Sequence, residues 1–145
     1  MAAHEAASIL LVCAANVCRS PMAALTLRQR FDGLAAVDQV RIASAGVSAD
    51  AGSPVCPSVS AFHDDPEWRE QAARHRSRVL DAEQVLGATL VLTASRAIRS
   101  SVAGALPERR DRVFTMREAA WLAQGFVREP GVQGADAVAA LWRHL

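Results

Sequence analysis

The chain lacks any excess of charge and any long apolar run. Its 145 residues carry 16 basic and 15 acidic side chains, for a formal net charge of +1. A balance this even gives no electrostatic reason to expect binding to nucleic acid or to an anionic membrane. The longest apolar stretch, residues 7–15, is too short to span a bilayer, and the N-terminus lacks the pattern of a secretion signal. We therefore expect a cytoplasmic protein with neither kind of partner.

Cysteine and aromatic side chains are also scarce. The three cysteines, two of them close together at Cys13 and Cys18, argue against a disulfide-stapled framework. Cys56 is expected to be a buried or turn residue, with a resolving thiol as the alternative reading. No C-x2-C pair or histidine cluster indicates a metal, so the sequence predicts no metal and no cofactor. The chain has no tyrosine and only 5% aromatic residues.

Composition and periodicity predict one α/β domain over residues 1–145. A hydrophobic fraction of 51% with 21% charged residues is typical of a globular α/β protein. Strands are expected near residues 8–13, 39–45, 88–93 and 112–115. Helices are expected near residues 21–31, 81–86, 95–105, 116–123 and 135–144. This alternation predicts a single three-layer domain, with a four-stranded, mostly parallel sheet flanked by helices.

Smaller features refine this outline. Asp65 and Pro66 are read as a helix-starting turn, and Asp81 as the N-cap of the helix that ends near Leu86. Trp121 and Trp142 are expected to pack in the interior rather than to line a substrate pocket.

The segment from Cys13 to Pro21 is the most informative part of the chain. It follows a short apolar run that suits a strand buried on both faces, and Pro21 suits the first position of a helix. The segment is thus expected to lie between the carboxyl end of a strand and the amino end of a helix. Free backbone N–H groups and the positive end of the helix dipole meet there. Both favour a bound phosphate and the ionised form of a cysteine.

The spacing within this segment assigns chemistry to its side chains. Cys13 and Arg19 are far enough apart for the chain to curl around one small anion, which the planar fork of Arg19 would grip by two oxygens. The hydroxyl of Ser20 can donate to the Cys13 sulfur and stabilise a thiolate. Asn16 suits a position of positive φ in the loop. A buried structural cysteine is the alternative, and the strand-loop-helix setting favours a nucleophile over it.

The segment V-C-A-A-N-V-C-R-S-P-M-A resembles the signature loop of the low-molecular-weight protein tyrosine phosphatase family, which includes thiol-dependent arsenate reductases. Three further stretches are similar to family segments, and a fourth, residues 89–93, sits where the third strand of the family would lie. The three are Ser44-Ala45-Gly46, Gly52-Ser53-Pro54 and His75-Arg76-Ser77-Arg78. The resemblance covers roughly residues 8 to 123, and the first loop is its most specific part.

The resemblance implies a role for each matching residue. Cys13 would be the nucleophile, Arg19 the phosphate clamp and Ser20 the thiolate stabiliser. Asn16, Ser44 and His75 would form the hydrogen-bond network that supports the loop. Cys18 would be the neighbour able to form a reversible protective disulfide with Cys13. The phosphate-binding loop would comprise Cys13, Ala14, Ala15, Asn16, Val17, Cys18 and Arg19.

Two positions depart from the family pattern. Ala15 stands where the family usually has glycine, and its Cβ is expected to crowd the anion or shift the loop. The general acid of the family is an aspartate followed by proline in a late loop, whereas this chain has Glu129-Pro130. Either Glu129 serves as a displaced general acid, or the aspartate loop is missing and Glu129 is a solvated loop residue.

The predicted function is a cysteine-dependent phosphomonoester hydrolase that acts through a phosphocysteine intermediate. The residues Ala49-Asp50-Ala51 replace the bulky aromatic that family members acting on phosphotyrosine often carry at the pocket rim. A smaller or more polar phosphoester, on a protein or free, is therefore expected as substrate. Two alternatives remain open: an arsenate reductase that uses an external small thiol, and a catalytically weak module that binds oxyanions or phosphoproteins. The sequence does not specify an oligomeric state.

Overall fold

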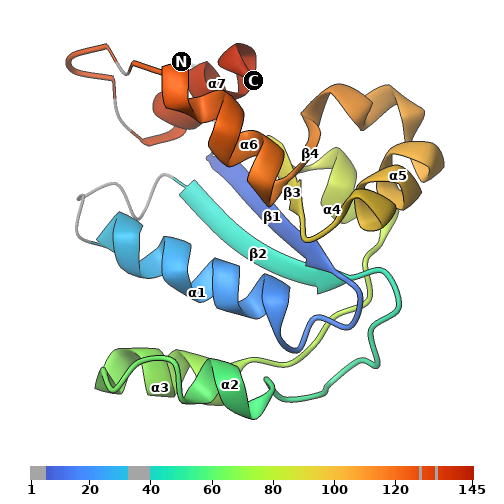
Figure 1. The fold of residues 1–145 in the computed structure, drawn as a ribbon, viewed down its shortest axis with the longest axis vertical. Helices are drawn as coiled ribbons and strands as arrows, with labels where there is room; N and C mark the ends of the chain where they lie inside the picture. The colour runs from blue at the N-terminus through green and yellow to red at the C-terminus, as the bar shows by residue number, and fades with distance from the viewer. Residues whose placement is uncertain (1–5, 33–39, 128, 133) are drawn as a thin grey trace.

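A four-stranded parallel sheet forms the centre of the computed structural model, which describes residues 6–32, 40–127, 129–132 and 134–145 (Figure 1). The strands are β1 (Ala7–Cys13), β2 (Val40–Gly46), β3 (Leu90–Thr93) and β4 (Val113–Thr115). Their order is β2-β1-β3-β4, and all three pairings are parallel. The predicted fold class is confirmed. Within the described residues, no helix is long and apolar enough to cross a membrane.

Helical segments connect the strands, as parallel pairing requires. The α-helices are α1 (Arg19–Asp32), α2 (Pro57–Ser60), α3 (Pro66–Arg74), α4 (Ala82–Leu86), α5 (Arg96–Ala105), α6 (Met116–Leu122) and α7 (Gly134–His144). Two 3-10 turns, η2 (Pro107–Arg112) and η3 (Ala123–Gly125), follow α5 and α6.

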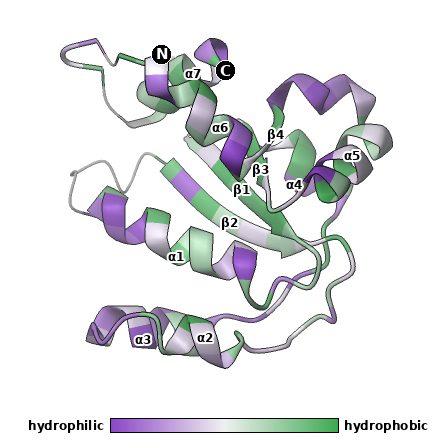
Figure 2. Ribbon diagram, in the orientation of Figure 1, coloured by the Kyte–Doolittle hydropathy of each residue, from purple (hydrophilic) through white to green (hydrophobic). Residues whose placement is uncertain are grey.

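The side chains of β1 alternate between two apolar layers, because successive residues of a strand point to opposite faces. Ile9 and Leu11 pack on the face covered by α1 and α7, and Leu10 and Val12 on the face covered by α4 and α5. Figure 2 shows the hydrophobic colour concentrated on the strands and the hydrophilic colour on α3 and on the segment between α5 and β4. The central strand is thus buried on both sides, and its end is held in a fixed position.

A smaller apolar cluster lies between α1, α2 and α3. Trp68 of α3 is its largest side chain, and the indole N–H donates to the carbonyl of Val59 at 2.7 Å. Asp65 caps α3 by accepting from the N–H of Glu67, so the predicted helix-starting turn is confirmed. This cluster fixes the segment before α2 beneath the start of α1, next to the loop that follows β1.

Most predicted boundaries hold within two residues. Asp81 caps α4 with a full capping box, as the sequence predicts. Helix α1 begins at Arg19, so Pro21 is its third residue, whereas the sequence predicted the first. The missing N–H costs nothing there either, because the N–H groups of the first turn have no intrahelical acceptor. Residue 39, the expected start of the second strand, lies outside the described residues.

The prediction for Trp121 is wrong. Its side chain is 68% exposed, because α6 contributes Met116 and Ala119 to the interior and turns Trp121 away from the sheet. Trp142 is half-buried: its ring packs under Arg112 at 4.4 Å, and its N–H donates to the carbonyl of Asp111.

Candidate active site

The candidate nucleophile lies where a buried strand ends. Cys13 is the last residue of β1, it is 2% exposed, and its sulfur is a free thiol. The Sγ atom lies 2.9 Å from Ser20 Oγ and accepts from the backbone N–H of Asn16 at 3.2 Å. Ser20 is buried in the first turn of α1, so the hydroxyl is held against the sulfur. Both contacts stabilise negative charge on the thiol when the hydroxyl donates.

The carbonyl groups of the loop after β1 point outward. The carbonyls of Cys13 and Ala14 accept from the N–H groups of Val47 and Ser48, and the carbonyl of Val17 accepts from that of Cys56. In a planar trans peptide, the C=O of one residue and the N–H of the next point in opposite directions. The next N–H groups in the chain therefore point to the inner side of the loop, above the Cys13 sulfur. An inner wall of N–H groups is an anion-binding surface.

Asn16 is the centre of the network behind this loop. It is fully buried and has a φ of 55°, the positive value that the sequence predicts and that asparagine tolerates. Its side-chain Nδ2 donates to the hydroxyls of Ser20 and Ser44, each at 2.9 Å. Its Oδ1 accepts from the backbone N–H of Arg78 at 2.9 Å. The side chain thus joins the start of α1, the end of β2 and the segment after α3.

His75 supports the same residue from the other side. Its Nε2 lies 2.8 Å from the carbonyl oxygen of Asn16 and donates to it in the tautomer that carries its proton there. Burial lowers the pKa of His75, the hydrogen bond to Asn16 raises it, and the charges of Arg28, Arg76 and Arg78 lower it further. A neutral imidazole is therefore favoured at neutral pH.

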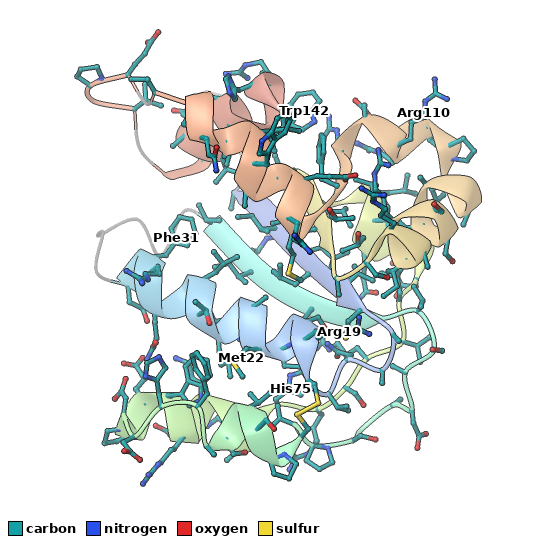
Figure 3. All side chains as sticks on the ribbon, in the orientation of Figure 1. Arg19, Met22, Phe31, His75, Arg110 and Trp142 are labelled. Atoms are coloured by element: carbon teal, nitrogen blue, oxygen red, sulfur yellow. A yellow bond between two sulfur atoms is a disulfide. The ribbon has the colours of Figure 1, made fainter. Side chains whose placement is uncertain are left out.

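Arg19 opens α1 directly after the loop. The residue is exposed, and Figure 3 shows its side chain beside the ends of β1 and β2, at the carboxyl edge of the sheet. The structure thus brings together Cys13, Asn16, Arg19, Ser20, Ser44 and His75.

Gly46 completes the site, and only the resemblance singled it out from the sequence. A Cβ on Gly46 would lie 2.5 Å from the carbonyl oxygen of Ala14 and 2.9 Å from both the carbonyl carbon of Ala15 and the nitrogen of Asn16. All three are backbone atoms, so they cannot move aside as a flexible side chain would. The loop needs glycine here because it packs directly on the end of β2.

Sequence comparison agrees with this geometry. The family model for the low molecular weight phosphotyrosine protein phosphatases matches residues 8–137. The chain belongs to this family. It is 32% identical over 124 residues to a protein-arginine-phosphatase of Geobacillus stearothermophilus, covering 84% of this chain and 77% of that protein. It is also 32% identical over 133 residues to the low molecular weight protein-tyrosine-phosphatase Etp of Escherichia coli, covering 90% of this chain and 81% of that one.

Solved structures of other family members have the same fold. The low molecular weight protein tyrosine phosphatase from T. tengcongensis superposes with a TM-score of 0.67 at 26% identity, covering 94% of this chain and 90% of that one. A YwlE arginine phosphatase whose active-site cysteine is replaced by a phosphorylated serine superposes with a TM-score of 0.63 at 28% identity, covering 94% of this chain and 91% of that one. In that relative, the residue in place of the cysteine carries the phosphoryl group.

The disulfide of this family member differs from the expected one. Cys18 is bonded to Cys56, with their Cα atoms 5.4 Å apart, so the pairing with Cys13 that the resemblance implied is wrong for this structure. The reason lies in the loop geometry. Cys13 is buried under the inner side of the loop, whereas Cys18 is exposed, and the N–H of Cys56 donates to the adjacent carbonyl of Val17 at 2.7 Å. Cys56 is thus a partner of Cys18 as well as a turn residue before α2.

The two departures from the family pattern lie at different places. Ala15 is exposed at the tip of the loop, so its methyl group does not pack in the core. Glu129 is exposed and lines a separate cavity with Phe126, Val127, Val132, Asp136, Ala140 and Arg143. Helix α7, which follows, packs Val138 against Ala7 at the start of β1. Figure 1 shows the described residues between α6 and α7 beyond the beginning of the strands, at the end opposite the loop that follows β1. The structure does not bring Glu129 to the loop.

No group of three or more His, Cys, Asp and Glu residues is placed to hold a metal ion within the described part of the chain.

Proposed function

We propose that this chain is a cysteine-dependent phosphatase that transfers the phosphoryl group of its substrate to Cys13 and then to water. The observation that carries the proposal is the position of the Cys13 sulfur beneath a loop whose carbonyls at Cys13, Ala14, Asn16 and Val17 face neighbouring segments as hydrogen-bond acceptors. That loop presents its N–H groups to an oxyanion before the substrate arrives. Donors fixed in advance stabilise charge that develops in the transition state, because they need no reorganisation during the reaction.

In the first step, the thiolate attacks phosphorus while the bond to the leaving group breaks. The new S–P bond gives phosphocysteine, and the leaving group takes the electron pair of the broken bond and a proton from an acid. Arg19, beside the loop, grips two of the equatorial oxygens, and the loop N–H groups hold the rest.

In the second step, water attacks phosphorus and the S–P bond breaks. A base takes the proton of the water, inorganic phosphate leaves, and the electron pair returns to the sulfur. Ser20 stabilises this departing thiolate through its hydroxyl, which lies 2.9 Å from Sγ. Asn16 acts through Ser20, because its side-chain N–H donates to the same hydroxyl and fixes its orientation.

Two carboxylates are candidates for the general acid. Glu129 is the residue that the family resemblance indicates, and for this role its loop must move to the carboxyl edge of the sheet. A second carboxylate, Asp50, is exposed on the segment that runs beside the loop through Val47 and Ser48. Substitution of each carboxylate decides between them.

Phosphorylated proteins are the proposed substrate class. The relatives include phosphatases named for arginine and for tyrosine. Residues 47–51, which run beside the loop, contain no aromatic side chain on which a phenyl ring could stack. We therefore expect hydrolysis of a phosphoarginine peptide to be at least as efficient as that of a phosphotyrosine peptide of the same sequence. A cytoplasmic location is proposed with this function.

The test is turnover of an aryl phosphate by the Cys13→Ser variant. Hydrolysis should fall to background, while Cys18→Ser, the matched control on the same loop, retains most of the activity. Full activity of Cys13→Ser would refute the mechanism. Wild-type protein that binds vanadate without turnover from pH 5 to 8 would instead indicate the binding module. Thiol-dependent release of arsenite from arsenate, without phosphatase turnover, would indicate the reductase.

A further inference from the structure

The end of α3 and the segment after it carry three arginines that the proposed chemistry does not use. Along residues 75–78, half-buried or buried side chains alternate with exposed ones. Ser77 points inward: it is 3% exposed, and its hydroxyl donates to the carbonyl of Asp50. The flanking Arg76 and Arg78 are exposed on the other side, and Arg74 precedes them at the end of α3. The alternation thus turns one row of guanidinium groups outward.

These arginines line a cavity of about 550 Å³ at the free edge of β2, between α1 and α3. We call it the arginine cavity, and its lining comprises Arg28, Ile42, Ala43, Ser44, Gln71, Arg74, His75, Arg76 and Arg78. Four of these side chains are guanidinium groups, and none is a carboxylate. The volume lies within the range of small-molecule sites, roughly 300 to 1,000 Å³.

The positive charge of the cavity is only partly balanced. Arg74 pairs with Glu70 across the exposed surface of α3, and exposed pairs of this kind are worth little. Arg28 donates to the backbone carbonyl of Ile42 at 2.7 Å and feels the charge of Asp32. Arg76 donates to the backbone carbonyls of Ala73 and His75, which carry no net charge. The lining of the arginine cavity therefore carries more positive charge than the nearby carboxylates neutralise.

The positive charge of the cavity acts on the imidazole of His75. The charges of Arg28, Arg76 and Arg78 lower its pKa, in addition to the effect of burial. Even so, its Nε2 remains bonded to the carbonyl of Asn16. His75 and Ser44 thus face the arginine cavity on one side and the loop residue Asn16 on the other.

We propose that the arginine cavity binds a small molecule that carries a diphosphate group, at a site distinct from the phosphate loop. Guanidinium forks match the oxygens of phosphate groups in pairs, and two linked phosphates engage several forks at once. The two sites are separate because the cavity lies behind the carbonyl of Asn16, whereas the N–H of the same residue faces the Cys13 sulfur. The cavity lining contains no Phe, Tyr or Trp, so the phosphate groups, which the guanidinium forks match, are the part of the ligand that we expect to supply most of the affinity.

Titration calorimetry with pyrophosphate tests the proposal, in the Arg19→Ala variant so that the phosphate loop is weakened. One binding event should remain. The double substitution Arg76→Gln and Arg78→Gln in that background should weaken it at least about tenfold, because each charge-assisted contact contributes a factor of this size. Arg110→Gln is the matched control: it removes one guanidinium on the opposite side of the molecule, as Figure 3 shows, and should leave the affinity unchanged.

The outcomes are distinct. Loss of all pyrophosphate binding in Arg19→Ala, or equal affinity with and without the arginine pair, would overturn the proposal. If the double variant does not fold, backbone NMR of Arg19→Ala decides: pyrophosphate should shift the amide signals of Ile42, Ala43 and His75, and an unchanged spectrum refutes the site. ADP should bind about as tightly as pyrophosphate, and binding of ADP without pyrophosphate would refute the diphosphate assignment. Aryl phosphate turnover is not measured in any arm, so failure of the catalytic proposal leaves this test intact.

Discussion

Replacement of Gly46 by alanine perturbs the candidate site without removing any reacting group. The added methyl group meets the backbone of the loop, with its closest contact 2.5 Å from the carbonyl oxygen of Ala14. An ordinary contact starts at 3.4 Å, so the loop or the end of β2 must move by roughly 0.9 Å. The carbonyl of Ala14 accepts from Ser48 on the same segment, so the two backbones are tied together and the strain passes to the neighbouring N–H groups of the loop.

The size of the effect follows from this displacement. A misplacement of about 1 Å between reacting groups costs roughly 100-fold in rate. Overpacking of a close backbone contact also costs about 1 to 3 kcal/mol of stability, which lowers the Tm by roughly 3 to 10 °C for a chain of this size. We therefore expect Gly46→Ala to fold at room temperature with kcat/KM reduced about 100-fold, far beyond what the loss of stability explains.

The assay is hydrolysis of an aryl phosphate alongside a thermal melt. Gly104→Ala is the matched control, because a Cβ at this position in α5 meets no atom within 4 Å. Alanine is also the better helix former by roughly 0.5 to 1 kcal/mol, so this variant should be slightly more stable and equally active. Gly46→Ala with a kcat/KM within twofold of the wild type would refute the argument that the loop depends on this close approach.

Four further substitutions test other parts of the structure. If Glu129 is the general acid, Glu129→Gln should reduce kcat at least about 100-fold for a substrate with a poor leaving group. Loss of rate in Asp50→Asn alone would assign the role to Asp50. The measurement is kcat for a series of substrates that differ in the pKa of the leaving group. Cys56→Ser should lower the free energy of unfolding, measured by chemical denaturation, by about 4 kcal/mol. This is the value for a disulfide between cysteines 38 residues apart. Added dithiothreitol should reduce the wild-type disulfide and abolish the difference between the two proteins. The lowered pKa of His75 means that the unfolded chain binds more protons below pH 6.5, so stability should fall as the pH drops from 6.5 toward the folded-state pKa. His75→Gln should flatten that part of the profile, and an unchanged slope would contradict the assignment.

The loop was predictable from the sequence because its determinants are local. A buried strand, a short loop with asparagine at the position of positive φ, and a helix start follow one another within residues 8 to 21. Parallel pairing then places the end of β1 at the same edge as the ends of its neighbours. These rules specify where Cys13 and Arg19 lie without any knowledge of the rest of the chain.

The pairing of Cys18 was not predictable in this way. Sequence proximity favours Cys13, five positions away, over Cys56, which is 38 positions away. The choice depends on which cysteine faces the inner side of the loop and on the hydrogen bond that holds Cys56 beside Val17. Both are tertiary contacts that no local pattern reports.

The prediction that Trp121 packs in the interior was wrong for a related reason. Helical periodicity says which residues share a face, but the direction of that face depends on how the helix meets the sheet. In α6, the face that carries Met116 and Ala119 packs against the sheet. Trp121, the largest side chain of the helix, lies on the outer face. The position of Glu129 likewise depends on how α7 packs against the start of β1, which no local pattern reports.

The geometry of the phosphate loop results from contacts with three separate parts of the chain. Each part forms hydrogen bonds with the loop backbone or with Asn16. The three parts are the end of β2 with the residues that follow it, the segment before α2 and the segment after α3. A loop in isolation would turn some carbonyls inward, where they would repel a phosphate. Because the neighbouring segments bind those carbonyls on the outside, folding itself orients the N–H groups toward the anion. The free energy for assembling the site is therefore supplied by folding, and a substitution such as Gly46→Ala can reduce catalysis without contacting the substrate.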